Sequence, residues 1–157
     1  MRYLGVIWIN NMKIKQIILT ILLTISTLSA SNVNWLSNMD VAIEKATETQ
    51  TPILVFVYSD TCHYCSQSIE VFKDERIKNI LSRKDKLTIV AVNKNNKKDI
   101  AKYQLNTQLY PTYFILSSSG ERISEPFKGF MDAEILNEML VSLLSWYEEL
   151  LNTPFHQ

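Results

Sequence analysis

The sequence predicts an α/β domain in which a central mixed β-sheet carries helices on both faces. Two observations lead to this fold class. Short apolar runs, typical of buried strands, alternate along the chain with segments whose apolar residues recur every three or four positions, as on one face of a helix. The predicted order is β-α-β-α-β-β-α with an extra helix in front, and strands that alternate with helices favour a sheet covered on both sides.

The extra helix at the N-terminal side is predicted around residues 41–46, where small and apolar side chains share one face. Ser37 and Asn38 precede it as candidate N-caps. Pro52 then marks the entry to the first strand, 53–58, which is a run of apolar, β-branched and aromatic residues.

Two helices and a second strand are expected next. Residues 66–72 have helical spacing, and Asp74 stands where it can cap a further helix. Three apolar residues fall on one side of that further helix: Ile77, Ile80 and Leu81. Residues 87–92 are predicted to form the second apolar strand, and residues 99–103 are typical of a short helix.

The last third of the chain completes the pattern. Residues 113–116 are predicted as the third strand, and the serine-rich stretch 117–120 ends in glycine, which is typical of a turn. Residues 122–128 are expected to return beside this strand. Apolar residues at helical spacing over 135–144, behind Asp132 as a cap, predict the final helix.

The N-terminus has the pattern of a secretory signal peptide, predicted over residues 1–31. The first thirty residues hold three bases and no acid, and the apolar stretch 17–28 is well short of the roughly 20 residues that a membrane-spanning helix needs. Small residues follow that stretch, so cleavage rather than retention as an anchor is expected. Met12 begins a complete basic region of its own and is a possible true start. Residues 32–157 then have the length of one ordinary domain.

The charge and the few possible ligands argue against nucleic-acid and metal sites. Without the three N-terminal bases, thirteen lysines and arginines face sixteen acidic residues, which leaves a mildly acidic domain. The basic stretch 94–98 is interpreted as a solvated loop and helix start. A structural zinc site needs four ligands, and two cysteines with His63 and His156 make a weak set. Residue 66 is serine, which excludes the Cys-X-X-Cys-His haem attachment motif. We expect no cofactor.

Cys62 and Cys65 are the two cysteines of the chain, and they stand where the first strand gives way to a helix. A disulfide that closes so few residues constrains the unfolded chain little, so redox exchange is its plausible use. A helix N-terminus favours an anion, so Cys62 is predicted to be the attacking thiolate. Cys65 lies one turn into the helix and is predicted to resolve the mixed disulfide. An idle structural bridge remains the alternative.

His63 and Tyr64 lie between the two cysteines and are candidates for redox tuning. A protonated His63 would stabilise the Cys62 thiolate and thereby make the disulfide more oxidising. A histidine that simply points to solvent is the competing interpretation. Tyr64 is expected either to pack beside a substrate peptide or to cover the edge of the helix.

The order of elements, with Cys-X-X-Cys at the first strand-to-helix junction, resembles the thioredoxin superfamily. Tyr110-Pro111-Thr112 matches the family's proline before the strand opposite the active site, and Phe127-Lys-Gly-Phe130 matches its glycine before the last helix. The resemblance implies a thioredoxin fold with Pro111 in the cis form. It also implies a substrate groove in which the Tyr110 backbone lies beside Cys62. For Tyr110, a core aromatic is the alternative.

Within the superfamily, the chain has Trp35 before its first helix and the helix start Val-Phe-Lys-Asp-Glu-Arg-Ile at 71–77. With these features it looks most like exported bacterial thiol reductases, namely the C-terminal periplasmic domain of the disulfide reductase DsbD and SoxW-like thioredoxins. This resemblance implies a periplasmic monomer that reduces disulfides in protein substrates and receives electrons from a membrane thiol transporter of the DsbD or CcdA kind. A disulfide oxidase or isomerase and a non-catalytic binding or chaperone-like module stay open. Two departures stand out: Thr61 replaces the frequent tryptophan before the first cysteine, and Phe56 replaces the buried acid of cytosolic thioredoxins.

Overall fold

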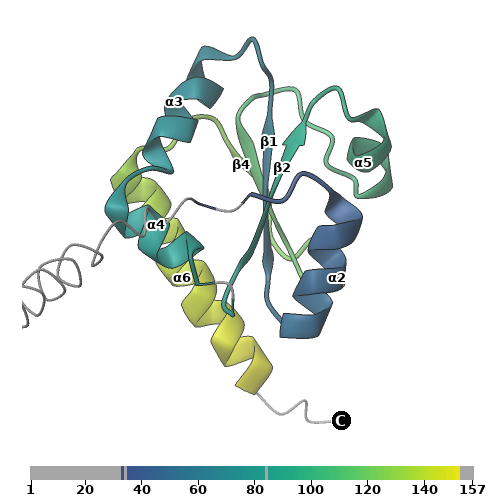
Figure 1. Ribbon diagram of the computed structural model, residues 1–157, viewed down its shortest axis with the longest axis vertical. Helices are drawn as coiled ribbons and strands as arrows, with labels where there is room; N and C mark the ends of the chain where they lie inside the picture. Colours follow the sequence, from purple (N-terminus) through teal and green to yellow (C-terminus); the bar gives the residue numbers. More distant parts are fainter. Residues whose placement is uncertain (1–32, 34, 84, 153–157) are drawn as a thin grey trace, which may run out of the picture. The chain divides into compact units, whose positions relative to one another are not determined.

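The helices and strands of the domain succeed one another largely in the predicted order. A computed structural model describes residues 33, 35–83 and 85–152, all of which belong to the unit 31–157. The expected signal peptide, 1–31, lies outside the described residues. The elements are α2 (Met39–Thr49), β1 (Ile53–Tyr58), α3 (His63–Val71), α4 (Glu75–Leu81), β2 (Thr88–Asn93), α5 (Lys97–Lys102), β3 (Thr112–Leu116), β4 (Phe127–Lys128) and α6 (Ala133–Asn152) (Figure 1). Among the described helices, none has the length and apolar character needed to cross a bilayer.

The sheet is mixed, with the strand order β2-β1-β3-β4. β1 pairs with β2 in parallel and with β3 in antiparallel orientation, so β1 lies in the middle of the sheet. In the antiparallel pair, Phe56 of β1 stands opposite Tyr113 of β3. The predicted mixed sheet is therefore confirmed.

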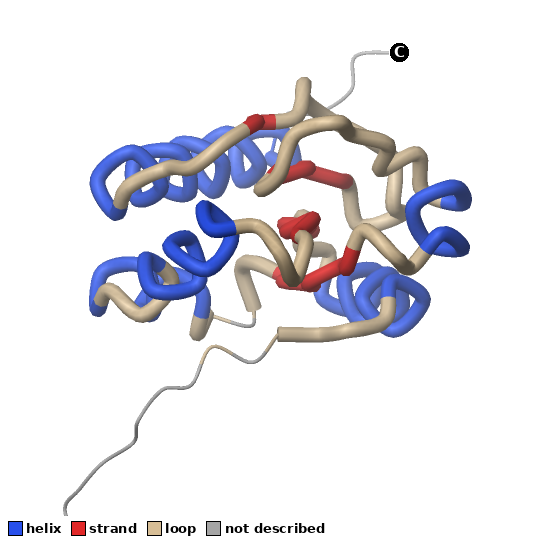
Figure 2. Tube along the Cα trace, turned by 90° about the horizontal axis from the view of Figure 1, so that it is seen from above, coloured by secondary structure: helices blue, strands red, loops and turns tan. Residues whose placement is uncertain are grey.

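Helices cover both faces of the sheet, as Figures 1 and 2 show. Side chains of β1 alternate between the two faces because successive residues of a strand point to opposite sides. Val55 and its odd-numbered neighbours in β1 pack in the cluster that includes α2, whereas Leu54 and Phe56 pack in the cluster that includes α3, α4 and α6. Both faces of β1 are thus apolar, which explains why its sequence is a continuous apolar run.

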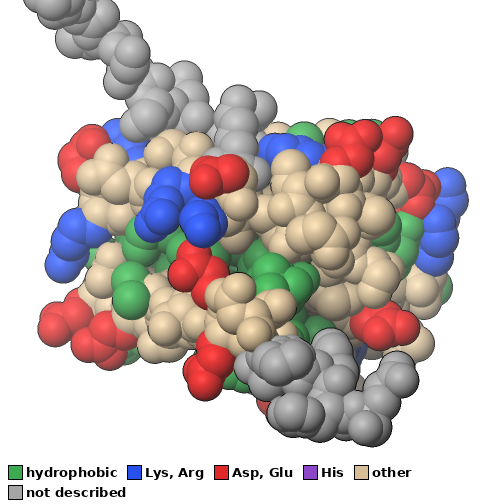
Figure 3. All heavy atoms as spheres, turned by 90° about the horizontal axis from the view of Figure 1, so that it is seen from below, with side chains coloured by type: hydrophobic (Ala, Val, Ile, Leu, Met, Phe, Trp, Pro, Cys, Tyr) green, Lys and Arg blue, Asp and Glu red, His purple; other side chains and the backbone are tan. Residues whose placement is uncertain are grey.

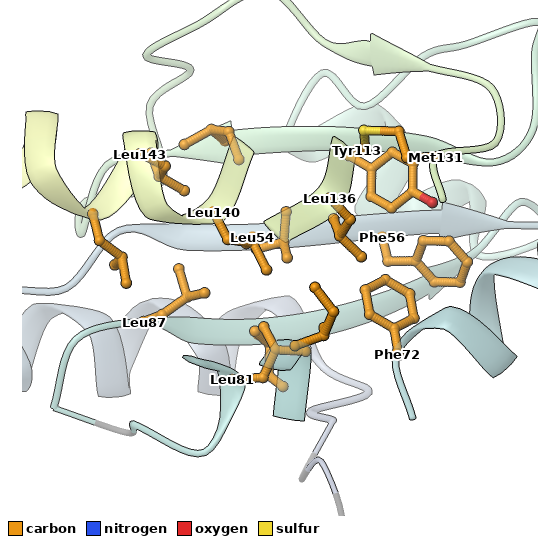
Figure 4. Packing of buried hydrophobic residues seen from close by; sticks show 14 of the residues in the cluster. Leu54, Phe56, Phe72, Leu81, Leu87, Tyr113, Met131, Leu136, Leu140 and Leu143 are labelled. Atoms are coloured by element: carbon orange, nitrogen blue, oxygen red, sulfur yellow. The ribbon is translucent and has the colours of Figure 1, made fainter. Parts of the chain in front are cut away.

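The core behind the first strand-to-helix junction is built from aromatic rings and leucines. Figure 4 shows Leu136 and Leu140 of α6 directed at Leu54 on β1, with Phe56 and Phe72 near the end of that cluster. The indole of Trp35 packs against this cluster. Its ring centroid lies 4.6 Å from that of Phe72 and 5.8 Å from that of Phe56. This packing fixes the end of β1 from which the chain turns into α3.

Helix caps account for several of the element boundaries. The side chain of Asn38 accepts hydrogen bonds from the backbone N–H groups of Asp40 and Val41, and Asp74 accepts one from Arg76. Of the two candidate caps for the first helix, Asn38 is therefore the one used. Helix α5 begins at Lys97, two residues earlier than predicted, because the Asn96 side chain caps it by accepting the N–H of Asp99.

The return strand predicted over residues 122–128 is much shorter in the structure. It consists of an isolated bridge between Leu116 and Arg122 and the two residues of β4. Pro126 stands directly before β4 and has no N–H to donate to a ladder. The turn at residues 117–120 thus indicated the correct neighbour but not the length of the paired segment.

Candidate active site

Cys62 is the N-cap residue of α3, at the junction that the sequence predicted. Its backbone N–H donates to the carbonyl of Ser59, which closes the turn after β1. Its sulfur accepts a hydrogen bond from the backbone N–H of Cys65 at 3.1 Å. The side chain is partly exposed, so the sulfur is both oriented by the helix and open to a reaction partner.

Cys65 lies behind Cys62 and is 1% exposed. Both cysteines are free thiols in this structure. Burial, with smaller contributions from the hydrogen bond to Cys62 and the charge of Cys62, raises the pKa of the Cys65 thiol to about 11. Cys65 is therefore a protonated thiol at neutral pH. Of the two cysteines, Cys62 is the one that solvent and a reaction partner can reach.

The Tyr110–Pro111 peptide bond is cis, as the resemblance implied, and this segment faces the Cys62 turn. The Cys62 thiol donates to the carbonyl of Tyr110 at 3.4 Å. The Tyr110 ring is half-buried, and its hydroxyl donates to the carbonyl of Thr107 at 3.3 Å. The structure thus brings four of the predicted site residues together, namely Cys62, Cys65, Tyr110 and Pro111.

A third segment joins the site at Gly129. Its N–H donates to the Pro111 carbonyl at 2.8 Å, and its φ of 97° lies in the region that glycine adopts without strain. The next residue, Phe130, is 41% exposed and places its ring centroid 6.4 Å from that of Tyr64, which is 57% exposed. Two aromatic side chains therefore flank the mouth of the site.

His63 and Tyr64 project outward from the first turn of α3. Both side chains are exposed, and their rings meet edge to face at 5.9 Å. In the described part of the chain, His63 makes no hydrogen bond to either sulfur. Redox tuning by His63 and a substrate contact by Tyr64 stay predictions.

A buried hydroxyl pair that the sequence reasoning missed lies on the inner side of α3. Tyr113 of β3 donates to Ser68 of α3 at 3.0 Å, and Ser68 donates to the carbonyl of Tyr64. Burial, with a smaller contribution from negative charge on Cys65 or Cys62, raises the pKa of Tyr113 to about 12. The only sequence signal was that Ser68 follows Cys65 by three residues and so shares its helix face.

Among the described residues, the core beside Cys65 holds no carboxylate that could take up its proton. Phe56 is buried against aromatic rings, in agreement with the departure noted in the sequence. Within the described residues, Asp99 is the one buried acid, and it pairs with Asn96 at the start of α5. The described residues also contain no cluster of three or more His, Cys, Asp or Glu side chains suited to a metal ion.

The difference between the two cysteines predicts selective alkylation. We expect iodoacetamide to modify Cys62 at least about tenfold faster than Cys65 at pH 7, because Cys65 is buried and protonated. Fragmentation of the tryptic peptide that holds both cysteines locates the label over time. In urea the two rates should converge, and equal rates in the folded, reduced protein would remove the assignment of Cys62 as the nucleophile.

The profile of the thioredoxin-like domain family matches residues 39–143, which span every element from α2 into α6. The chain belongs to this family. A search of curated proteins gave no match. The predicted superfamily and fold class are thus confirmed.

Solved structures of low sequence identity share this fold. A thioredoxin from Thermus thermophilus is 14% identical and superposes with a TM-score of 0.60, covering 80% of this chain and 98% of that chain. An oxidoreductase named DsbH is 17% identical and superposes with a TM-score of 0.57, covering 75% of this chain and 90% of that chain. The C-terminal domain of DsbD from Neisseria meningitidis is 18% identical, with a TM-score of 0.52, and the match covers 74% of this chain and 98% of that chain. A thioredoxin-like fold with a Cys62/Cys65 pair of this geometry supports thiol-disulfide exchange.

Proposed function

We propose that this protein is an exported, periplasmic thiol-disulfide oxidoreductase that reduces disulfides in proteins. The observation that carries the proposal is the pairing of a partly exposed Cys62 at the start of α3 with a buried, protonated Cys65. Export is supported by the signal-peptide pattern over residues 1–31. An N-terminus near Ser31 in protein recovered from cells would test the export step.

The reaction proceeds by two exchange steps. The Cys62 thiolate attacks one sulfur of the substrate disulfide, a new bond joins Cys62 to the substrate, and the other substrate sulfur leaves as a thiolate. Cys65 then loses its proton and attacks the Cys62 sulfur, which releases the second substrate thiolate. Two electrons pass from the dithiol to the substrate, and Cys62 and Cys65 end as a disulfide.

The contacts of the Tyr110 segment support a place for the substrate backbone. The Tyr110 carbonyl already accepts a hydrogen bond from Cys62, so a chain joined to that sulfur lies against this segment. An extended substrate would add main-chain hydrogen bonds there, in the manner of β-augmentation. We assign the substrate groove to Tyr110, Pro111 and the exposed ring of Tyr64.

The reducing direction and the electron source rest on resemblance to exported bacterial reductases. The DsbD C-terminal domain is among the structures that share the fold. A reductase outside the cytoplasm needs electrons, and a membrane thiol transporter of the DsbD or CcdA kind would supply them to the Cys62–Cys65 disulfide. We propose that the protein acts as a monomer.

Insulin reduction tests the activity. With dithiothreitol as the electron source, the wild-type protein should accelerate precipitation of the insulin B chain, whereas Cys62→Ser should match dithiothreitol alone because the attacking thiolate is gone. Thr61→Ser, an exposed neighbour, is the matched control and should behave as wild type. A wild type that does not exceed the dithiothreitol background would favour the non-catalytic module.

A redox titration tests the direction. Thioredoxin has a reduction potential of about −270 mV, against about −120 mV for the oxidase DsbA. We expect the Cys62–Cys65 couple to lie nearer the first value, measured by alkylation after equilibration with glutathione or dithiothreitol buffers. A potential near the second value would assign the protein to the oxidases instead.

A further inference from the structure

A polar hollow of about 550 Å³ opens beside Tyr110. Three segments that lie far apart in the sequence form its wall: the loop after β2 with the start of α5, the loop 105–110, and β4. Lysines Lys94, Lys97 and Lys128 come from the first and last of these segments, and Asn106, Thr107 and Gln108 add polar groups. We call this hollow the lysine pocket.

The lysine pocket gathers positive charge that is not neutralised by an acid in its wall or by an ion pair among the described residues. No Asp or Glu lines it. In the described part of the chain, the ion pairs engage Lys73, Arg76, Lys78, Lys86 and Lys102, and none involves a lysine of the pocket. The ammonium of Lys94 lies 6.0 Å from the ring centroid of Tyr110. Three unpaired ammonium groups around one hollow attract an anion.

The positive charge of the lysine pocket contrasts with the charge of the domain as a whole. Beyond the first thirty residues the chain is mildly acidic, and on the face seen in Figure 3 basic and acidic side chains are interspersed. The carboxylate of Asp60 accepts the side-chain amide of Asn93, the residue before Lys94, at 2.9 Å and does not line the pocket. The interpretation of residues 94–98 as a solvated loop missed the contribution of Lys128, which the sheet brings in from β4.

Tyr110 links the lysine pocket to the reactive sulfur. Tyr110 belongs to both, because its carbonyl accepts the Cys62 thiol at 3.4 Å while the residue also lines the pocket. A polypeptide held on Cys62 advances about 3.3 Å per residue when extended, so residues close to its cysteine reach the pocket. A small free anion would not need this alignment with Cys62.

We propose that the lysine pocket binds acidic side chains that lie within a few residues of the reacting cysteine of a partner polypeptide. Disulfides flanked by Asp or Glu are therefore the preferred partners of Cys62. This inference rests on the proposed thiol-disulfide exchange and names the class of partner for it.

Three model peptides test the preference. Each carries one cysteine as a mixed disulfide with thionitrobenzoate, flanked by glutamates, by glutamines or by lysines. The reduced protein attacks this disulfide and releases thionitrobenzoate, whose absorbance gives the second-order rate constant. At low ionic strength the glutamate peptide should react at least about fivefold faster than the glutamine peptide, and the lysine peptide more slowly, because steering by fixed charge raises association rates. Sodium chloride at about 0.5 M should remove most of the difference, since the Debye length falls below about 5 Å.

Two triple variants locate the effect. Lys94→Gln with Lys97→Gln and Lys128→Gln should bring the glutamate-to-glutamine rate ratio close to one. Lys45→Gln with Lys73→Gln and Lys86→Gln removes the same charge from residues that do not line the pocket and should leave the ratio near the wild-type value. Both variants should keep the wild-type rate with the glutamine peptide, which shows that Cys62 still reacts.

The outcomes separate the pocket from the proposed function. Absence of Cys62-dependent release with every peptide would overturn the function itself. Equal rates for the glutamate and glutamine peptides, or the same loss of preference in both triple variants, would overturn the pocket while exchange remains. Citrate at constant ionic strength provides a further arm: if citrate blocks all three peptides equally in the wild type, the pocket is a site for small carboxylates and the inference is wrong.

Discussion

Replacing Cys65 by serine is expected to stop multiple turnover and to leave Cys62 covalently joined to its disulfide partner. The reason is that Cys65 lies directly behind Cys62 and supplies the second thiol of the exchange. A serine hydroxyl is not ionised near neutral pH, so we expect the rate of substrate release in the absence of added thiol to fall at least about 100-fold. Non-reducing gels should show a complex that dithiothreitol dissolves.

Two controls accompany this experiment. The double variant Cys62→Ser with Cys65→Ser should form no complex, and Ser66→Ala, at an exposed neighbouring position of α3, should turn over as wild type. Complexes that form through Cys65 in the Cys62→Ser variant would contradict the assignment of roles. Identification of the trapped proteins would also show whether acidic residues flank their reacting cysteines.

The resolving step, in which Cys65 attacks the mixed disulfide, is expected to become faster as the pH rises. The raised pKa of Cys65, about 11, means that only about 10⁻⁴ of it is thiolate at pH 7, and this fraction grows about tenfold per pH unit up to that value. Burial, the largest cause of the shift, persists when Cys62 is in the mixed disulfide, whereas the charge of Cys62 is lost. Release of substrate should therefore accelerate from pH 7 to 9, which stopped-flow measurements on the wild type would follow.

The sequence predicted most of the fold because its signals are local. Strand 53–58 is apolar at each position since both of its faces are buried, and its boundaries match β1. Asn38 and Asp74 act as caps through hydrogen bonds to residues only two or three positions ahead. The Cys-X-X-Cys pair was found in the same way, because a strand, a turn and a helix start follow one another directly.

The parts that the sequence could not predict depend on contacts between distant segments. Tyr113 reaches Ser68 because β3 pairs antiparallel with β1, and local spacing does not reveal that register. The lysine pocket likewise includes Lys128 because β4 pairs with β3, which follows the Tyr110 segment of the pocket wall. The shortness of β4 was missed because a turn predicts that the chain returns but not how far it pairs, although Pro126 signalled the interruption.

An aromatic residue stands where cytosolic thioredoxins have a buried acid. Phe56 occupies that position and packs against Phe72 and Tyr113, so the space beside Cys65 is aromatic. The buried hydroxyls of Tyr113 and Ser68 already pair with each other, and a backbone group of Ser59 hydrogen-bonds to Cys65. Proton removal from Cys65 therefore falls to the departing substrate thiolate or to water in the proposed mechanism.

Truncation of a buried leucine in α6 is the second change with a large expected effect, and it lowers the stability of the fold rather than the rate of exchange. Leu140 is 0% exposed and packs on the face of the sheet that lies behind the active site. Replacing Leu140 by alanine removes three buried carbon atoms and leaves a cavity, so we expect the free energy of unfolding to fall by about 2–5 kcal/mol. Urea denaturation of the reduced protein, followed by the fluorescence of Trp35 and the other tryptophans, measures this change.

Val141→Ala is the matched control because Val141 is the next residue of the same helix and is 52% exposed. It should change the free energy of unfolding by no more than about 0.5 kcal/mol. The folded Leu140→Ala protein should still show faster alkylation of Cys62 than of Cys65, since Cys62 is held by β1, α3 and the Tyr110 carbonyl rather than by α6. A loss below about 1 kcal/mol in Leu140→Ala would mean that α6 does not pack against the sheet as described, because a fully buried leucine cannot be truncated at so small a cost in a well-packed core.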